Sequence, residues 1–163
     1  MKRIKVINEP TELVPVMRAM DTEVKRKVFM EVSNRWCTAN AIEELYGPEG
    51  RQALNFFEKM KLVETRWESV DSISEKAYHT YYLSFHINTT VAVQDIAEVL
   101  AAVVMPDEEF GALEDTIVEQ VHDGGRFAGD VSEEMGLSQV MLRSLVKRST
   151  KLDYRGHRVE ISE

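Results

Sequence analysis

The sequence predicts a mainly helical α+β fold with small β-hairpins beside the helices. Most of the chain carries apolar residues three or four positions apart, interrupted by Gly and Pro, which is typical of short amphipathic helices. Three stretches, 62–67, 77–85 and 152–161, instead alternate or are rich in β-branched and aromatic residues, which favours strands. With 163 residues, 44% of them apolar, the chain is long enough for two small packed domains.

Residues 127–158 show the pattern of two short helices joined by a tight turn. Gly136 suits the positive φ that ends the first helix, and Ser138 is a favourable N-cap for a second helix over 138–149. The apolar residues that two crossing helices bury fall at the required spacing, namely Val131, Met135, Leu137, Leu142 and Leu145. A hairpin with a turn at Gly156 follows. Helix, turn, helix and hairpin together predict a winged helix.

Positive charge is concentrated in the same stretch. Residues 138–158 hold six Lys or Arg against one acid, a local charge of +5, whereas the rest of the chain holds 14 against 27 and the whole chain is −8. Such a stretch is expected to face a polyanion, although its side chains could also merely solvate the last helix and hairpin. The first interpretation assigns base reading to Gln139, Arg143 and Ser144, and phosphate contacts to Lys147, Arg148, Lys151, Arg155 and Arg158, with His157 beside them at the hairpin tip.

Residues 38–85 repeat the winged-helix pattern more loosely. A helix capped by Thr38 or Asn40 ends at Gly47, and a second helix follows it. The remaining predicted elements are a strand at 62–67, a polar loop at 68–76 and a strand at 77–85. Candidate DNA contacts in this unit are Arg51, Gln52, Asn55 and Lys59. Because the loop has a net charge of −2, the first unit is expected to bind DNA weakly or to serve assembly.

The N-terminal segment is predicted to contain two further helices. One opens at Pro10 and Thr11, and the other is capped by Asp21. Residues 2–7 suit either a strand or a basic arm, and the sequence favours neither.

The run from Val28 to Phe85, with its helix-turn-helix, its strand KLVETRW and its strand YHTYYLSF, resembles the ArsR-type winged-helix transcription regulators, particularly archaeal ones. The C-terminal stretch resembles a second winged helix of the same superfamily. The resemblance implies a homodimeric regulator that binds double-stranded DNA. Many members sense metals through Cys, His and carboxylate clusters, but no paired cysteines precede the recognition helix here.

Residues 90–105 are predicted to form a helix with a broad apolar stripe and few charges. The stripe either forms a dimer interface or is buried against the core of its own chain. The first interpretation gives the dimer contacts Val93, Ile96, Leu100, Val103 and Val104. The domain boundary is placed near Met105, which divides the chain into an N-terminal domain, 1–105, and a C-terminal domain, 106–163.

The sequence contains no glycine-rich phosphate loop, no His-x-x-Glu-His spacing and no Cys-x-x-Cys pair, so neither an enzyme nor a cofactor is expected. The absence of a long apolar run or a signal-like start predicts a soluble, cytoplasmic protein. Two alternatives to a DNA-binding regulator stay open. One is a tandem winged-helix adaptor that binds other proteins, and the other is a metal or redox sensor that uses His79, His86 or Cys37.

Overall fold

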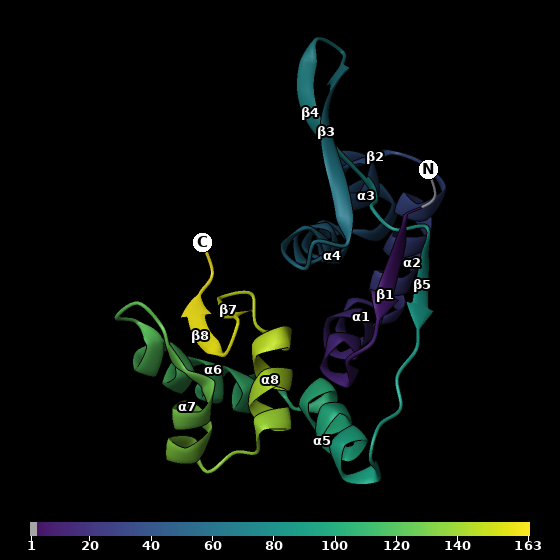
Figure 1. Ribbon diagram of the computed structural model, residues 1–163. Helices are drawn as coiled ribbons and strands as arrows, with labels where there is room; N and C mark the ends of the chain where they lie inside the picture. The colour runs from purple at the N-terminus through teal and green to yellow at the C-terminus, as the bar shows by residue number, and fades with distance from the viewer. Residues whose placement is uncertain (1–2) are drawn as a thin grey trace. The chain divides into compact units, whose positions relative to one another are not determined.

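The computed structural model describes residues 3–163 and divides the chain into two compact units. Unit 1 comprises the N-terminal residues up to Val6 together with 19–87, and unit 2 comprises 7–18 and 88–163. Figure 1 shows the elements of both units. Within residues 3–163, no helix is both long and apolar enough to cross a bilayer.

Three helices build the body of unit 1: α2 (Glu23–Asn34), α3 (Ala39–Tyr46) and α4 (Pro48–Lys59). The side chain of Thr22 caps α2 and that of Thr38 caps α3, each by accepting a hydrogen bond from a main-chain N–H three residues on. The predicted cap at Asp21 is therefore displaced by one residue. Gly47, with φ 73°, separates α3 from α4, as the sequence predicts.

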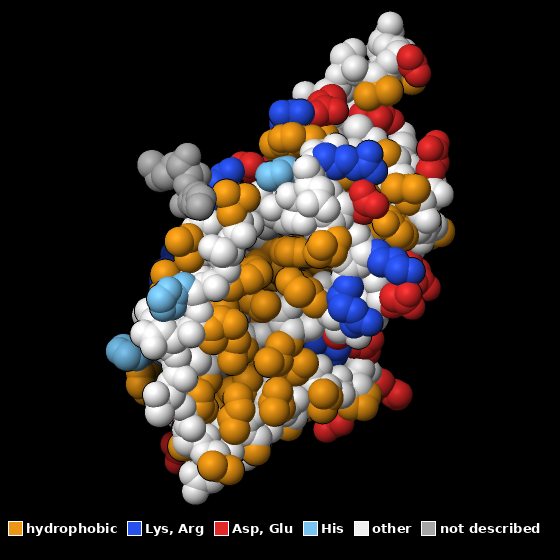
Figure 2. Space-filling view, turned by 90° about the vertical axis from the view of Figure 1, so that its right-hand side faces the viewer, with side chains coloured by type: hydrophobic (Ala, Val, Ile, Leu, Met, Phe, Trp, Pro, Cys, Tyr) orange, Lys and Arg blue, Asp and Glu red, His pale blue; other side chains and the backbone are white. Residues whose placement is uncertain are grey.

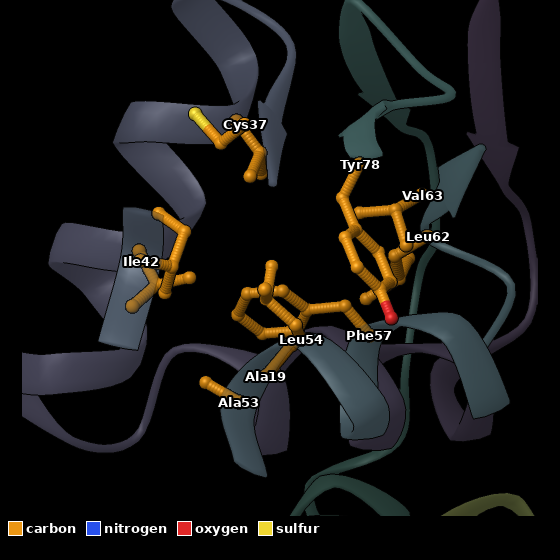
Figure 3. Close-up of a cluster of buried hydrophobic side chains, with 11 residues drawn as sticks. Ala19, Cys37, Ile42, Ala53, Leu54, Phe57, Leu62, Val63 and Tyr78 are labelled. Carbon is orange, nitrogen blue, oxygen red and sulfur yellow. The ribbon is translucent and has the colours of Figure 1, made fainter. Parts of the chain in front are cut away.

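Apolar side chains from all three helices and from the sheet meet in one core. Ile42 of α3 and Leu54 and Phe57 of α4 are fully buried there, and Tyr78 closes the core from the sheet side (Figure 3). The ring of Phe57 meets that of Phe29 edge-on, with 5.3 Å between the ring centroids. This packing fixes the orientation of α4 relative to α3, and so determines which side of α4 faces solvent.

A three-stranded antiparallel sheet completes unit 1 as a winged helix. Its strands are β2 (Cys37–Thr38), β3 (Val63–Val70) and β4 (Ile73–Thr80), in the order β2-β4-β3. Asp71 and Ser72 both have positive φ, which is typical of a two-residue type I′ turn. The predicted loop at 68–76 is wrong, because these residues form the distal half of the β3–β4 hairpin. Both faces of that half are largely solvated, so the sequence there is polar without a strand-like alternation.

The predicted strand at 77–85 is interrupted. The strand β4 ends at Thr80, and a separate strand, β5 (Ser84–Ile87), pairs with β1 (Ile4–Ile7). The N–H of Leu83 donates to the carbonyl of Arg3 at 2.8 Å, and that of Asn88 donates to the carbonyl of Ile7 at 2.9 Å. Because the residue numbers of the bonded pairs increase along both strands, β1 and β5 run parallel. The part of the N-terminal segment that the structure describes is thus a strand rather than a free arm.

Unit 2 also contains the elements of a winged helix. The first elements of this unit are η1 (Pro10–Glu12), most of α1 (Leu13–Ala19) and α5 (Val93–Val104). The winged helix itself consists of α6 (Asp107–Val121), β6 (Arg126–Phe127), α7 (Ala128–Met135), α8 (Gln139–Arg148), β7 (Leu152–Arg155) and β8 (Arg158–Ile161). Gly136 is left-handed, with φ 67°, and Ser138 caps α8 by accepting from the N–H of Met141 at 3.0 Å. The predicted turn and cap are confirmed.

The helix α8 lies between two apolar clusters of unit 2. Its residues Leu142, Leu145 and Val146 pack into the main cluster with side chains of α6, α7, β7 and β8. Val140 packs into a second cluster that is built by α1 and α5 around Val14. Both η1 and α5 contact α8. The structure therefore groups α5 and the N-terminal segment 7–18 with the C-terminal winged helix, whereas the sequence predicts a domain boundary near Met105.

Candidate nucleic-acid interface

The predicted reading helix of unit 2 is largely covered. Among the ten residues of α8, Gln139 is the one exposed residue, and Arg143 and Lys147 are half-buried. Ser144 is 0% exposed and Arg148 is 4% exposed. The prediction that Ser144 and Arg148 contact DNA is wrong, because neither side chain reaches the surface of the unit. The cause is the second apolar cluster, which covers the side of α8 that was expected to face a groove.

Arg148 instead binds the segment that joins α5 to α6. One guanidinium nitrogen donates to the carbonyls of Ala102 at 2.9 Å and Met105 at 2.7 Å. The other donates to the carboxylate of Asp107 at 2.7 Å, and the guanidinium lies 4.3 Å from the ring centroid of Phe110. Burying this charge is tolerated because the guanidinium has hydrogen-bond acceptors and a carboxylate partner. Its role is to hold α8 against α5 and α6.

Arg143 is neutralised within unit 2 by Glu9, which precedes η1. The two side chains form an ion pair, and the guanidinium lies 4.8 Å from the ring centroid of Tyr154 on β7. Burial raises the pKa of Glu9, but the hydrogen bond and the charge of Arg143, together with the hydroxyl of Thr11 and the charge of Lys147, leave that pKa lowered overall. An arginine held in this way is poorly placed to read a base.

The Glu9–Arg143 pair makes a testable contribution to stability. Because the pKa of Glu9 is lower in the folded chain than in the unfolded chain, the carboxylate stabilises the fold above its unfolded pKa, and this stabilisation is lost as pH falls through its folded pKa. We expect Glu9→Gln to lower the urea midpoint at about pH 7, and to lower it less as the pH falls to about 3. Glu12→Gln, in the same segment, is the control. An equal effect of Glu9→Gln at both pH values would contradict this assignment.

The hairpin β7–β8 exposes its cations as predicted. Arg155, His157 and Arg158 are all exposed around the turn at Gly156. The Arg155 guanidinium lies 3.4 Å from the carboxylate of Glu160, and Arg158 donates to the carbonyl of Gly125 at 2.9 Å. Nearby, Lys151 lies 3.4 Å from Glu114 and 3.7 Å from Asp115. Most of the cations in the positive stretch are thus paired within unit 2, although the three side chains around the turn remain accessible.

The distribution of charge between the units reverses the expectation from the sequence. Unit 2 holds 8 Lys or Arg against 17 acids, a net charge of −9, and unit 1 holds 12 against 11, a net charge of +1. The local +5 of residues 138–158 is real, but Glu9, Asp107, Glu114 and Asp115, which are distant in sequence, offset it. Overall charge therefore favours unit 1 as the part of the chain that approaches a polyanion.

The helix α4 of unit 1 has the exposed polar face that α8 lacks. Gln52, Asn55 and Lys59 are exposed and share one side of α4, because they are spaced three and four residues apart. Ala53, Leu54 and Phe57 are buried on the opposite side. Arg51, the fourth predicted contact on this helix, is half-buried and pairs with Glu43 and the side-chain oxygen of Asn40. Amide and ammonium groups on a solvent-facing helix are the groups that read base edges in a major groove.

The residues proposed for metal or redox sensing lie in unit 1. The ring of His79 stacks on Trp36, with 5.3 Å between the centroids, and its Nδ1 lies 2.9 Å from the carbonyl oxygen of Thr80. Cys37 is buried, and burial raises the pKa of its thiol, which disfavours the reactive thiolate. Across the part of the chain that the structure describes, no group of three or more His, Cys, Asp or Glu lies close enough together to hold a metal ion.

A comparison with protein families connects both units to one family. The model described as "ArsR transcriptional regulator" matches residues 7–163, which include nearly all of unit 1 and the whole of unit 2. No curated protein matches the chain. The match covers both winged helices and all the helices named above, so it does not depend on the first unit alone. The chain therefore belongs to the ArsR family of transcriptional regulators.

Proposed function

We propose that this regulator binds double-stranded DNA and reads its sequence with α4 of unit 1. The observation that carries the proposal is the contrast between the two candidate reading helices: α4 exposes Gln52, Asn55 and Lys59, whereas α8 exposes Gln139 alone. Asn and Gln side chains suit adenine, and Lys suits guanine or phosphate. The near-neutral charge of unit 1 supports the same choice. Unit 1, at +1, does not repel a polyanion overall, whereas unit 2, at −9, does.

The second hairpin of the chain has an auxiliary role in this proposal. Arg155, His157 and Arg158 around the β7–β8 turn are exposed and lie close together in sequence. Their hydrogen-bonding groups suit phosphate oxygens, which position a protein on DNA without specifying a sequence. We assign them to phosphate contacts and assign base reading to α4.

Titration with DNA tests the proposal. A duplex selected from a random pool with the full chain is labelled and titrated at low and at high salt. We expect the selected duplex to bind more tightly than a scrambled one, and the affinity for both to fall as salt rises, because phosphate contacts release counterions. Equal and salt-independent affinity for the two duplexes would contradict the proposal.

We further propose that the regulator is a homodimer that associates through α5. On this helix Val93 is 82% exposed, Val104 is 76% exposed and Leu100 is 41% exposed. Ala97 and Ala101 are also exposed, and the five positions follow one side of the helix. Within unit 2 this apolar stripe is uncovered, as a second copy of the chain would require.

Two of the predicted dimer contacts lie on the other side of α5. Val103 is buried and Ile96 is half-buried, and both pack in the cluster around Val14 and Val99 of unit 2. The predicted dimer contact at Val103 is wrong, because its side chain is enclosed in its own unit. The proposed contacts are therefore Val93, Leu100 and Val104. In this proposal the apolar residues of α5 serve both of the roles that the sequence left open, one on each side of the helix.

A charge placed on the exposed stripe tests this interface. We expect Leu100→Glu to make the protein monomeric at concentrations at which the wild type is dimeric, because the carboxylate would be desolvated in the contact. Sedimentation velocity measures the species directly. Met30→Glu, at an apolar position on α2 that is 60% exposed, is the control and should leave the dimer intact. A dimer that survives Leu100→Glu unchanged would place the interface elsewhere.

A further inference from the structure

The tip of the β3–β4 hairpin, residues 67–75, exposes large apolar side chains. Trp67 is 70% exposed, Ile73 is 65% exposed and Val70 is 39% exposed. Val70 and Ile73 face each other as the last pair before the turn. None of the three belongs to the hydrophobic core of unit 1. The fold of unit 1 therefore does not require them, and the tip extends beyond the helices of that unit (Figure 1).

The same nine residues carry negative charge only. They contain Glu68, Asp71 and Glu75 and no Lys or Arg. At the top of Figure 2 the end of the hairpin shows hydrophobic and acidic side chains side by side. Arg66 pairs with Glu68 at 2.6 Å and so offsets one of the three acids, whereas Lys76 is paired outside the tip, with Glu58. The tip keeps a negative charge. A tip of this charge is repelled by the phosphates that line either groove of DNA.

The two tryptophans of the chain differ in how much of the side chain is exposed. Trp36 is half-buried at the base of the hairpin, stacked on His79 and covered by the guanidinium of Arg66 at 4.0 Å. Trp67 is the exposed one. Exposed tryptophan costs solubility, and tryptophan is enriched among the residues that dominate the binding energy of protein interfaces. This contrast favours a contact with another macromolecule at Trp67.

Among residues 3–163, the outer edge of β3 carries no partner strand. In the order β2-β4-β3 this strand lies at the edge of the sheet, and it pairs on one side with β4. An edge strand accepts an extended segment of another protein through main-chain hydrogen bonds. The partner's alternate side chains would then meet the apolar and acidic groups of the tip.

We propose that residues 67–75 form a docking site for an extended, cationic segment of a partner protein. The segment pairs with the outer edge of β3. Its apolar side chains cover Trp67 on one face of the hairpin, and its Lys or Arg residues, which alternate onto the other face, meet Glu68, Asp71 and Glu75. Charge complementarity selects a basic partner over an acidic one. This surface is separate from α4, so the inference goes beyond the proposed DNA-binding function and does not depend on it.

Three labelled peptides of 12 residues test the site on the full chain by fluorescence anisotropy. One alternates Lys and Val, the second alternates Glu and Val, and the third alternates Lys and Ser. We expect the Lys–Val peptide to bind at least about tenfold more tightly than either of the others, because it alone has both the charge and the apolar side chains. We expect Trp67→Ser to weaken its binding by about tenfold or more.

Matched variants exclude general attraction to an acidic protein. Leu45→Ser replaces an apolar residue that is 55% exposed on α3, outside the hairpin, and should leave peptide binding unchanged. If Trp67→Ser does not give the circular dichroism spectrum of the wild type, Trp67→Thr, which keeps a β-branched side chain in the strand, replaces it in the test. Equal binding of the Lys–Val and Glu–Val peptides, or undiminished binding by the tip variants, would overturn the proposal. Protection of Trp67 fluorescence from acrylamide by duplex DNA would also overturn it, because the tip would then be a DNA contact.

Discussion

Replacement of Gln52 and Asn55 by alanine is expected to remove most of the sequence preference in DNA binding while leaving the fold intact. Both side chains are exposed on α4, so their loss removes no core contact. Each bidentate contact with a base is worth about 1–3 kcal/mol, so the double variant should lose most of the preference for a selected duplex over a scrambled one. Anisotropy titrations with the two duplexes measure this preference.

The matched control lies in the other candidate reading helix. Gln139 is the exposed residue of α8, and it has the same side chain as Gln52. We expect Gln139→Ala to leave both affinities unchanged. If Gln139→Ala removed the sequence preference and the α4 double variant kept it, the C-terminal winged helix would be the reader and our assignment would be reversed.

The second large effect concerns stability rather than binding. Arg148→Met should lower the free energy of unfolding by about 3 kcal/mol, because the buried carbonyls of Ala102 and Met105 lose their hydrogen-bond donor. Urea denaturation measures the change. Arg155→Met, at a side chain that is 75% exposed, is the control and should change stability by less than about 0.5 kcal/mol.

The same variant separates the two roles considered for Arg148. A buried arginine that only supports the fold should leave the DNA affinity of the folded fraction unchanged. If Arg148→Met kept the wild-type stability and weakened binding to all duplexes equally, Arg148 would be the phosphate contact that the sequence predicts. The two outcomes differ in both measurements, so one experiment distinguishes them.

Local signals in the sequence predicted the elements of the fold well. Gly136 and Ser138 end one helix and cap the next because the backbone there needs a positive φ and a side-chain acceptor, and both needs are met within a few residues. Thr38 and Gly47 define α3 for the same reason. Such features depend on neighbouring residues and are therefore visible in the sequence.

The candidate interface was harder to predict because it depends on residues that are far apart. A count of charge along residues 138–158 cannot include Glu9, just before η1, or Asp107, at the start of α6, which neutralise Arg143 and Arg148. The covering of α8 is similarly non-local. One signal was available, since Val140 is apolar and lies outside the stripe of Leu142, Leu145 and Val146. A helix that is apolar on more than one side is typically buried on more than one side.

The β3–β4 hairpin was predicted incorrectly for a local reason. Its distal half is polar, so a sequence pattern that depends on one buried face predicted a loop at 68–76. The structure forms strands there because the type I′ turn at Asp71 and Ser72 matches the twist of β3 and β4. The exposed position of Trp67 follows from that geometry, and alternation alone gave no indication of it.

Site-directed DNA cleavage tests the central claim most directly. Cys37 is buried and is the one cysteine of the sequence, so a cysteine introduced at an exposed position is labelled selectively with an iron chelate that cuts nearby DNA. Gln52→Cys places the chelate on α4, and Gln139→Cys places it on α8. We predict stronger cleavage inside the selected duplex from the α4 conjugate than from the α8 conjugate. Cleavage from the α8 conjugate alone would contradict our account of how this regulator reads DNA.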